Sequence, residues 1–410
     1  MNRFIPQYSH VSLFITLLVV LSLFQGCQQS QDSKTVAAKE DKGEIAEKEK
    51  KAEEGVKPLV GAYYYTWYSH VADGEPLGRW NRNMRLHLEH RQVPELGLYS
   101  SADPDVIGGH IRQSEQAGID FWAVSWWGPH SDGTLRDRIL KHPQHKKLRY
   151  ALLYESTGRL GTFANPRYEN WIPDLEYISK TYFDHPSYLR VNGRPVVFVY
   201  LTREYFRNKG HEALEEMRER FPELYLVGDD VFFGEPDEQY DPEWAKNFDA
   251  ITAYDVYGQS VKELGGTRKA IEFLTRNFTQ AREAANQVGT AFIPAVAPGY
   301  NDLATRPQEE HPGRARYFTD IPGSKEGDLF RAMIQDVALP NLDPSAENMF
   351  LITSFNEWLE DSQIEPTRGD QPPSQVGVSP AGVDLTQGQT YHDYGTLYLD
   401  ILKEELADKE

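Results

Sequence analysis

The sequence has one cysteine, few basic residues relative to acidic ones, and no apolar run long enough to cross a bilayer comfortably. One cysteine in 410 residues excludes an intramolecular disulfide, a cysteine-rich zinc site and an iron–sulfur cluster. The 43 Lys and Arg against 62 Asp and Glu give a formal net charge of −19, which argues against nucleic acid as the main partner and disfavours a highly anionic substrate. The composition is that of a globular protein, long enough for two domains or one large α/β barrel.

An apolar run of 14 residues lies near the amino terminus, at 11–24, and has the length of the hydrophobic region of a secretory signal. Cys27 follows Gly26, with Leu23 four residues ahead of it, in the arrangement of a lipoprotein signal. We therefore expect residues 1–27 to be a lipoprotein-type signal peptide with Cys27 lipidated. Such a protein is anchored at the bacterial cell surface or faces the periplasm; plain secretion, with Cys27 an ordinary thiol, is the alternative.

Residues 28–57 are rich in Lys, Glu, Ala, Gln and Ser and nearly lack aromatic or branched apolar side chains. Such a segment cannot offset its ordering entropy by burial, so we expect a disordered charged tether. Residues 58–410 then form the folded domain.

Within 58–410, short apolar runs rich in branched or aromatic residues alternate with amphipathic stretches. The runs are typical of strands buried on both faces of a parallel sheet, and they cover 59–66, 119–125, 148–154, 195–200, 224–228, 249–253, 291–296 and 349–353. The predicted helices are 104–117, 132–141, 170–182, 209–220, 264–287, 325–337 and 394–408. Eight such strands predict a single (β/α)8 TIM barrel; a doubly wound open sheet is the rival, but no glycine-rich phosphate loop follows any strand.

In a barrel of this type the active site lies at the carboxyl ends of the strands. The residues found there are Tyr65, Trp67, Trp126, Trp127, Glu155, Tyr200, Tyr254, Tyr257, Tyr300, Asn301, Asn356 and Glu357. Aromatic faces match the C–H faces of sugar rings, and amides and carboxylates hydrogen-bond hydroxyl groups, so this mixture indicates a saccharide site. Several of these aromatic residues could instead simply pack at the barrel mouth.

Glu357 and Glu360 follow the eighth predicted strand and are three residues apart, so one turn would place both on one side. Glycoside cleavage generally needs two carboxyl groups flanking the scissile bond, and two carboxylates in one cavity separate their proton affinities. Taken alone, a Glu-x-x-Glu pair is often just a solvated helix face. We interpret Asp361 as a surface or capping residue and Glu365 as a loop fastener.

The segment SFNEWLEDSQIEPT, residues 354–367, resembles the signature of glycoside hydrolase family 99, the endo-α-mannosidases and bacterial endo-α-1,2-mannanases. Supporting matches occur in order through nearly the whole of 58–405: GAYYYTWY (61–68), GIDFWAVSWWGP (118–129), LLYEST (152–157), RPVVFVY (194–200), TAYDVYG (252–258) and AVAPGYND (295–302). The chain departs from the family pattern at Leu359, where histidine is usual, and at Asp361-Ser362, where Gly-Thr is usual.

This resemblance implies a (β/α)8 barrel and retaining endo-hydrolysis of an α-mannosidic bond. It implies that Glu357 deprotonates the 2-hydroxyl of the mannosyl unit while Glu360 protonates the leaving oxygen. The resulting 1,2-anhydro sugar is then opened by water, with Glu360 as the base. An α-mannoside suits this route because its 2-oxygen and leaving group are trans. The expected partner is an α-mannan or a mannose-containing oligosaccharide, and the expected state is a monomer.

The remaining assignments concern substrate contacts. We expect Trp126 and Trp127 to include a stacking platform, and Glu155, Asn356, Tyr65, Trp67, Tyr200, Tyr254, Tyr257 and Tyr300 to contact sugar, with packing or support of the catalytic pair as the alternative. His87, Glu89 and His90 lie on a polar stretch with spacing unsuited to a metal, and no metal or cofactor is expected. Two other functions stay open: a barrel hydrolase acting on another α-glycan, and a non-catalytic surface glycan-binding lipoprotein.

Overall fold

The computed structural model describes residues 57–69, 78–207, 209–233, 238–256, 265–308 and 311–407. These residues belong to one compact unit. The predictions for the signal peptide, Cys27, residues 28–56 and Tyr257 lie outside the described residues. Within the described ranges, no helix combines the length and the apolar character that a membrane crossing requires.

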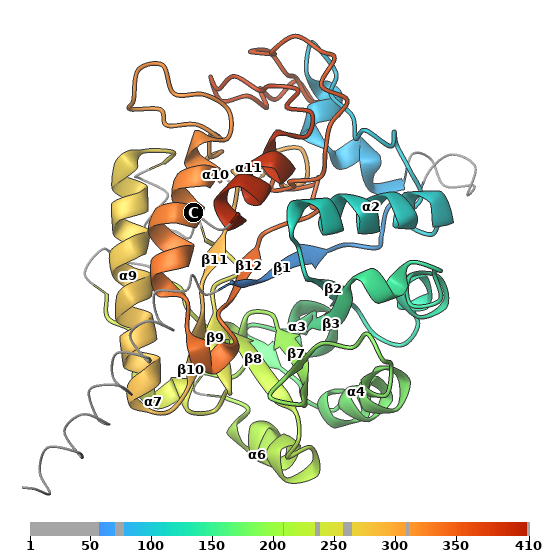
Figure 1. Cartoon of the computed structure of the whole chain (residues 1–410), viewed down its shortest axis with the longest axis vertical. Coiled ribbons are helices and arrows are strands. Elements are labelled where there is room, and N and C mark those ends of the chain that lie inside the picture. Colours follow the sequence, from blue (N-terminus) through green and yellow to red (C-terminus); the bar gives the residue numbers. More distant parts are fainter. Residues whose placement is uncertain are drawn as a thin grey trace, which may run out of the picture. The chain divides into compact units, whose positions relative to one another are not determined.

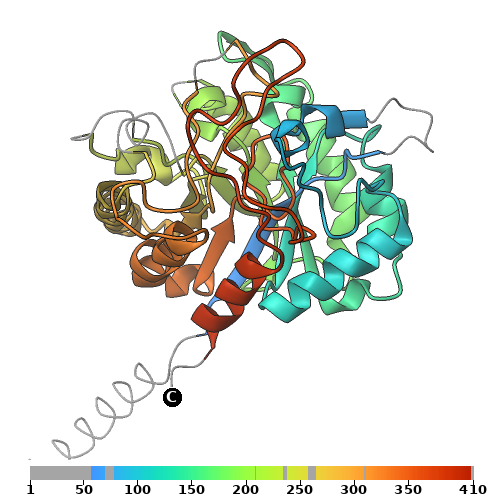
Figure 2. The same ribbon diagram turned by 90° about the horizontal axis from the view of Figure 1, so that it is seen from above.

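The described chain folds around a parallel β-barrel (Figures 1 and 2). Its strands are β1 (Leu59–Tyr64), β2 (Phe121–Trp126), β3 (Arg149–Tyr154), β7 (Arg194–Val199), β8 (Tyr225–Asp229), β9 (Ala250–Thr252), β10 (Ala291–Ile293), β11 (Ala295–Val296) and β12 (Met349–Ile352). Each strand pairs in parallel with the next one in this order, except that β10 and β11 do not pair with each other, and β12 pairs with β1. Within the described residues, three short strands lie outside the barrel: β4 (Gly161–Thr162), β5 (Asn165–Pro166) and β6 (Arg190–Val191).

One barrel position is shared by β10 and β11, which Pro294 separates. Proline has no N–H to donate, so the ladder is interrupted for one residue. The chain nevertheless continues in the same direction: β10 pairs with β9, β11 pairs with β12, and the Pro294 carbonyl accepts from Leu351 N at 2.9 Å. The barrel therefore has eight strand positions, which confirms the predicted (β/α)8 fold.

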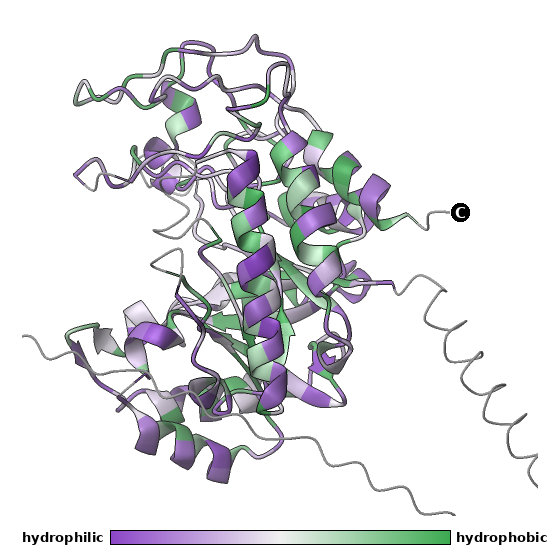
Figure 3. Cartoon of the chain, turned by 90° about the vertical axis from the view of Figure 1, so that its left-hand side faces the viewer, coloured by the Kyte–Doolittle hydropathy of each residue, from purple (hydrophilic) through white to green (hydrophobic). Residues whose placement is uncertain are grey.

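Helices surround the barrel (Figure 2). The α-helices are α2 (Pro104–Ala117), α3 (Ser156–Arg159), α4 (Trp171–Ile178), α5 (Thr202–Tyr205), α6 (His211–Arg220), α7 (Pro242–Ala245), α9 (Arg268–Gln287), α10 (Asp328–Ala332) and α11 (Leu397–Leu406). Short 3-10 or π turns are η2 (Gly78–Arg82), η3 (Met84–His87), η4 (Leu135–Ile139), η5 (His145–Lys147), η6 (Ser179–Phe183), η7 (Met333–Ala338), η8 (Leu339–Asn341) and η9 (Pro344–Ala346). The long helix α9 carries hydrophilic and hydrophobic residues in turn along its length (Figure 3), as expected of a helix with one buried face.

The predicted helices match these elements, with three differences in detail. The stretch 132–141 contains only the π turn η4, while 170–182 and 325–337 each begin as an α-helix and end as a π turn. Helix α2 agrees with its prediction at both ends because its sequence carries strong boundary signals. Asp103 accepts a hydrogen bond from Asp105 N at 2.9 Å, Pro104 occupies the first turn, and Gly118 ends the helix at φ 80°.

The barrel interior is filled by large side chains that face small ones. Phe121 and Phe198 stack with ring centroids 6.1 Å apart. A Cβ atom at Gly61 would lie 2.1 Å from the Phe121 ring, so only glycine leaves room for that ring inside the barrel. Because the interior below the strand ends is solid, substrate can reach only the loops that follow the strands.

Candidate active site

The loop that follows β12 holds both predicted catalytic carboxylates. Glu357 is 2% exposed, and the side chain of Glu360 is 17% exposed. The Ser354 hydroxyl accepts from Glu357 N at 2.7 Å, and Leu359 N donates to Glu357 Oε1 at 2.9 Å. The loop thus bends back on itself and orients the Glu357 carboxylate through its own backbone.

Buried side chains from other elements tie this loop to the barrel. Glu365 accepts hydrogen bonds from Trp358 Nε1 at 2.7 Å and from Tyr99 OH at 2.8 Å. The Tyr68 hydroxyl donates to the Asn356 carbonyl at 2.9 Å and accepts from Trp358 N at 3.0 Å. Tyr68 and Tyr99 lie far from this loop in sequence, so the loop geometry depends on the folded barrel.

Asp361 does not lie on the surface, contrary to the sequence interpretation. It is 1% exposed, and its carboxylate lies between Arg85 and Arg316, which are themselves buried. Arg316 Nη2 also donates to the Asp361 carbonyl at 2.8 Å. Burial by itself would raise the pKa of Asp361, but Arg316 and Arg85 outweigh it and hold that pKa below its usual value. Asp361 is therefore a buried counter-ion next to Glu360.

Replacing Asp361 by alanine is expected to lower the free energy of unfolding by about 3–5 kcal/mol, because two buried arginines lose their counter-ion. Chemical denaturation measures this loss. Since the folded-state pKa is depressed, the contribution is present at neutral pH and is lost as pH falls through that pKa. Asp137→Ala, which removes an exposed carboxylate paired with Arg136, is the matched control and should change stability little. Equal, small effects of both changes would contradict the assignment.

Several predicted tyrosines surround the carboxylate pair. The hydroxyls of Tyr65 and Tyr254 are hydrogen-bonded to each other, and the Tyr200 and Tyr254 rings lie 4.9 Å apart. Burial raises the pKa of Tyr65 well above its usual value, and the charges of Glu357, Glu155 and Glu360 add to this effect. Glu360 likewise contributes to the raised pKa of Tyr200 and Tyr254, after burial. The structure therefore brings these predicted residues together.

Two predicted sugar contacts have structural roles instead. Trp126 is 1% exposed and packs on Tyr154, with centroids 5.7 Å apart, and on Tyr177 of α4. Successive residues of a strand point to opposite faces, and Ser125 already reaches the site side through Glu155, so Trp126 points outward. Asn356 is buried, and both its amide atoms bond the Tyr65 backbone, at 2.8 Å and 2.9 Å. Asn356 supports the loop rather than offering its amide to a hydroxyl.

Trp67 and Trp127 form the accessible aromatic part of the site. Trp127 is 38% exposed, its ring centroid lies 6.1 Å from that of Trp67, and its Nε1 donates to Ser125 Oγ at 2.8 Å. Ser125 in turn donates to Glu155 Oε1 at 2.6 Å. The geometry therefore favours Trp127, not Trp126, as the stacking platform.

Glu155 follows β3 and is buried close to the catalytic pair. Burial raises its pKa to about 8, the hydrogen bond from Ser125 opposes this shift, and the charges of Glu360 and Asp229 add to it. A carboxyl group with this pKa is mostly protonated at neutral pH. Glu155 can then donate a hydrogen bond as well as accept one.

Glu360 lines a cavity of about 170 Å³ together with Tyr200, Tyr254 and Tyr300. The same cavity is lined by Asp255, Arg306 and His311, which the sequence analysis missed. Asp255 comes directly after the predicted strand-end residue Tyr254, so the strand-end rule could have found it. Arg306 and His311 lie within a long loop, and no sequence pattern marks them.

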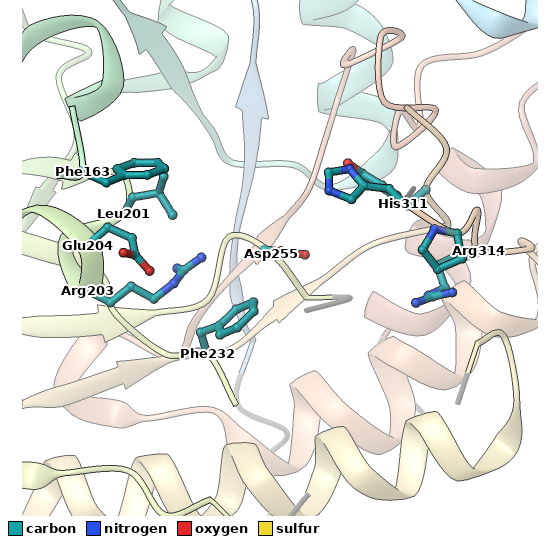
Figure 4. Close-up of a pocket in the computed structure, with 10 residues that line it drawn as sticks. Phe163, Leu201, Arg203, Glu204, Phe232, Asp255, His311 and Arg314 are labelled. Carbon is teal, nitrogen blue, oxygen red and sulfur yellow. The ribbon is translucent and has the colours of Figure 1, made fainter. Parts of the chain in front are cut away.

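A second pocket of about 440 Å³ adjoins this cavity and shares Asp255, Tyr300 and His311 with it. In Figure 4, Phe163, Leu201, Arg203 and Glu204 lie on one side of this pocket, His311 and Arg314 lie on the other, and Asp255 lies between them. The two pockets therefore share part of their lining.

The carboxylate pair has unusual proton affinity. Burial raises the pKa of Glu357 well above its usual value, and the neighbouring Glu360 raises it further. Burial also raises the pKa of Glu360, although the Arg306 guanidinium opposes this shift. Because two neighbouring carboxylates disfavour being charged together, the pair keeps a proton to higher pH than an isolated glutamate does. Among the described residues, no group of three or more His, Cys, Asp or Glu is arranged to hold a metal ion.

Two family models and several known proteins match this chain. The family model of glycosyl hydrolase family 99 matches residues 56–214, and the family model described as Glycosyltransferase WbsX matches residues 165–371. The chain is 24% identical over 342 residues to the glycoprotein endo-alpha-1,2-mannosidase of Rattus norvegicus, covering 75% of this chain and 67% of that one. It is 25% identical over 338 residues to the enzyme of that name from Xenopus laevis, covering 74% and 68%.

A solved structure shares the fold. The GH99 endo-alpha-mannosidase from Bacteroides thetaiotaomicron superposes with a TM-score of 0.60 and 24% sequence identity. The superposition covers 85% of this chain and 96% of that one. At this identity the likeness shows the barrel fold.

Proposed function

Because this chain belongs to glycoside hydrolase family 99, and also to the family described as Glycosyltransferase WbsX, we propose that it is a retaining, endo-acting α-mannoside hydrolase. The observation that carries the proposal is the neighbouring pair Glu357 and Glu360, whose raised pKa values let one of them hold a proton beside a cavity edged by aromatic rings. Glycoside hydrolysis needs such a pair, with one group able to donate a proton and the other able to accept one.

The reaction proceeds in two steps. In the first, Glu357 takes the proton of the mannosyl 2-hydroxyl, the 2-oxygen bonds to carbon 1, and the glycosidic bond breaks as Glu360 protonates the departing oxygen. In the second, Glu360 takes a proton from water, the water oxygen bonds to carbon 1, and the bond from carbon 1 to the 2-oxygen breaks. Glu357 then returns its proton to that oxygen. Two inversions at carbon 1 amount to retention.

Endo-action requires space for sugar units on both sides of the cleaved bond. The 440 Å³ pocket continues from the 170 Å³ cavity through Asp255, Tyr300 and His311. Trp67 and Trp127 offer further aromatic faces, and Trp127 is linked to Glu155 through Ser125. These features support a substrate longer than a disaccharide, such as an α-mannan or a mannose-containing oligosaccharide.

Incubation with yeast-type α-mannan, α-1,3-glucan and a mannosylated or glucosylated α-mannobioside tests the proposal. Oligosaccharide release from the mannosides alone is the expected result. Release only from the glucan would establish another α-glycan as substrate, and binding without release would establish a glycan-binding protein. The match to Glycosyltransferase WbsX favours one competing reaction, so an arm with GDP-mannose and a mannoside acceptor is included. Elongation of the mannoside acceptor with GDP-mannose would show that the protein transfers mannose rather than hydrolysing mannosides.

Glu155→Gln is expected to keep most activity at neutral pH, because Glu155 with a pKa of about 8 is already uncharged there. As pH rises through about 8, wild-type Glu155 ionises and adds a negative charge near Glu360, so activity falls. The glutamine variant should lack this part of the alkaline decline. Profiles of kcat/KM against pH measure the difference, with Glu115→Gln on the exposed face of α2 as control. A severe loss at neutral pH would show that the Glu155 carboxylate is needed in charged form.

We further propose that the protein is exported and anchored through a diacylated Cys27, as a monomer. Acyl chains give stable anchoring because each buried methylene adds about 0.8 kcal/mol of membrane affinity. Growth with labelled fatty acid should label the wild-type protein and not Cys27→Ala. Label retained in the variant would refute lipidation at this residue.

A further inference from the structure

The turn at residues 301–306, in the loop that follows the barrel strand β11, places Arg306 next to the loop of Glu357 and Glu360. Its start is closed by the carbonyl of Asp302, which accepts from Thr305 N and Arg306 N, each at 2.8 Å. The Asp302 side chain is fully buried, and its Oδ2 lies 2.7 Å from Arg306 Nη1 and 2.9 Å from His311 Nδ1. A buried carboxylate thus holds the head of Arg306 in a defined place.

Three contacts join this turn to the loop of Glu357 and Glu360. Asn301 N donates to the Glu360 carbonyl at 2.6 Å, and Thr305 Oγ1 donates to the Leu359 carbonyl at 2.9 Å. Arg306 Nη1 donates to Glu360 Oε1 at 3.0 Å. The turn therefore fixes both the backbone on either side of Glu360 and its carboxylate.

We propose that Arg306, held by Asp302, is a positioning residue that keeps the Glu360 carboxylate against the cavity and favours its charged form. This inference rests on the proposed function, because it assigns a task to Arg306 only if Glu360 exchanges protons. Arg306 lines the same cavity as Glu360 and is 37% exposed, so it also faces the incoming sugar. Its role is distinct from that of the pair, since arginine stays protonated throughout.

The need for a cation follows from the charges around Glu360. The facing groups are Glu357 on the same loop, Glu155 after β3, Asp255 after β9, Asp302 on the turn, and the hydroxyls of Tyr65, Tyr200, Tyr254 and Tyr300. His311 lies 2.9 Å from Asp302 Oδ2 and lines the same cavity as Glu360 and Asp255. The carboxylates and burial all disfavour a negative Glu360, and Arg306 opposes them. Without this cation, Glu360 would hold its proton too tightly to release it to the leaving oxygen.

The experiment compares Arg306→Gln, Arg306→Lys and the wild type. For Arg306→Gln, both limbs of the profile of kcat/KM against pH should move to higher pH by about one unit, because a favourable neighbouring charge is lost. The expected shift is at the low end for an opposite charge, because the Arg306 side chain is partly exposed. Arg306→Lys keeps the charge without the planar fork, so its profile should move less although kcat falls. Arg220→Gln, on the surface of α6, breaks an exposed ion pair and should leave the profile unchanged. Unmoved limbs in Arg306→Gln, with only KM raised, would overturn the proposal.

A second measurement does not depend on activity. In protein labelled with ¹³C at the glutamate carboxyl carbons, the Glu360 signal is identified by its absence in Glu360→Gln. Its titration midpoint should lie higher in Arg306→Gln than in the wild type. An unchanged midpoint would refute the role of Arg306 even in an active enzyme. A shifted midpoint in a protein that cleaves no mannoside would retain the electrostatic role and reject the proposed function.

Discussion

Glu357→Gln and Glu360→Gln are each expected to lower kcat by at least about 10²-fold, the lower end of the effect of removing a general acid or base. Glutamine keeps the shape of either side chain but cannot exchange a proton. The loop should survive in both variants, because Leu359 N can still donate to the side-chain oxygen at position 357 and Glu360 is partly exposed. Rates of oligosaccharide release from a defined tetramannoside measure the loss.

Two controls make this result specific. Glu115→Gln removes a carboxylate from the exposed Lys147 pair on α2 and should leave kcat unchanged. Thermal unfolding of the two active-site variants should show no loss of stability. The raised pKa values of Glu357 and Glu360 mean that the folded state disfavours their charged forms. Near-normal turnover in either variant would overturn the assignment of the pair.

A substrate whose cleaved mannosyl unit lacks the 2-hydroxyl is expected to react at least about 10⁴-fold more slowly than the parent mannoside, the upper end of acid–base effects, because the nucleophile itself is missing. In the proposed first step the 2-oxygen forms the new bond to carbon 1, and no protein group replaces it. The matched substrate is the 2-deoxy analogue with the same leaving sugar. Single-turnover rates at saturating enzyme separate this chemical effect from weaker binding.

The outcome distinguishes two retaining mechanisms. If Glu357 instead attacked carbon 1 directly, the 2-deoxy substrate would still react, and a covalent sugar–enzyme ester would accumulate on Glu357 and be visible by mass spectrometry. Substantial turnover together with such an ester would replace the anhydro-sugar route. Substantial turnover without it would leave neither route standing.

The fold was predictable because the strands of a parallel barrel have a simple sequence pattern. Residues buried on both faces produce near-continuous apolar runs, and all eight runs correspond to barrel positions, including 291–296 around Pro294. Helix boundaries were predictable where caps are present, as at Asp103 and Gly118. The stretches 170–182 and 325–337 have no such signal for the change from α-helix to π turn, so their internal form could not be foreseen.

The site was predictable only in part. The position of Glu357 and Glu360 after the last strand followed from the strand pattern, and so did the approach of Tyr65, Tyr200 and Tyr254. Strand alternation places Ser125 and Trp126 on opposite faces, but only the structure shows that Ser125 faces the site and Trp126 points outward. Asp361 could not have been placed, because its partner Arg85 is 276 residues away in sequence.

The sequence by itself determined the order of strands and helices and which residues follow each strand, because these depend on local periodicity and on the direction of parallel strands. Only the tertiary structure decided which charges meet. Proton affinity depends on burial and on distances of a few ångströms, and closure of the barrel brings Arg306 and Asp302 to Glu360, and Arg85 and Arg316 to Asp361, from segments whose separation along the chain says nothing about contact.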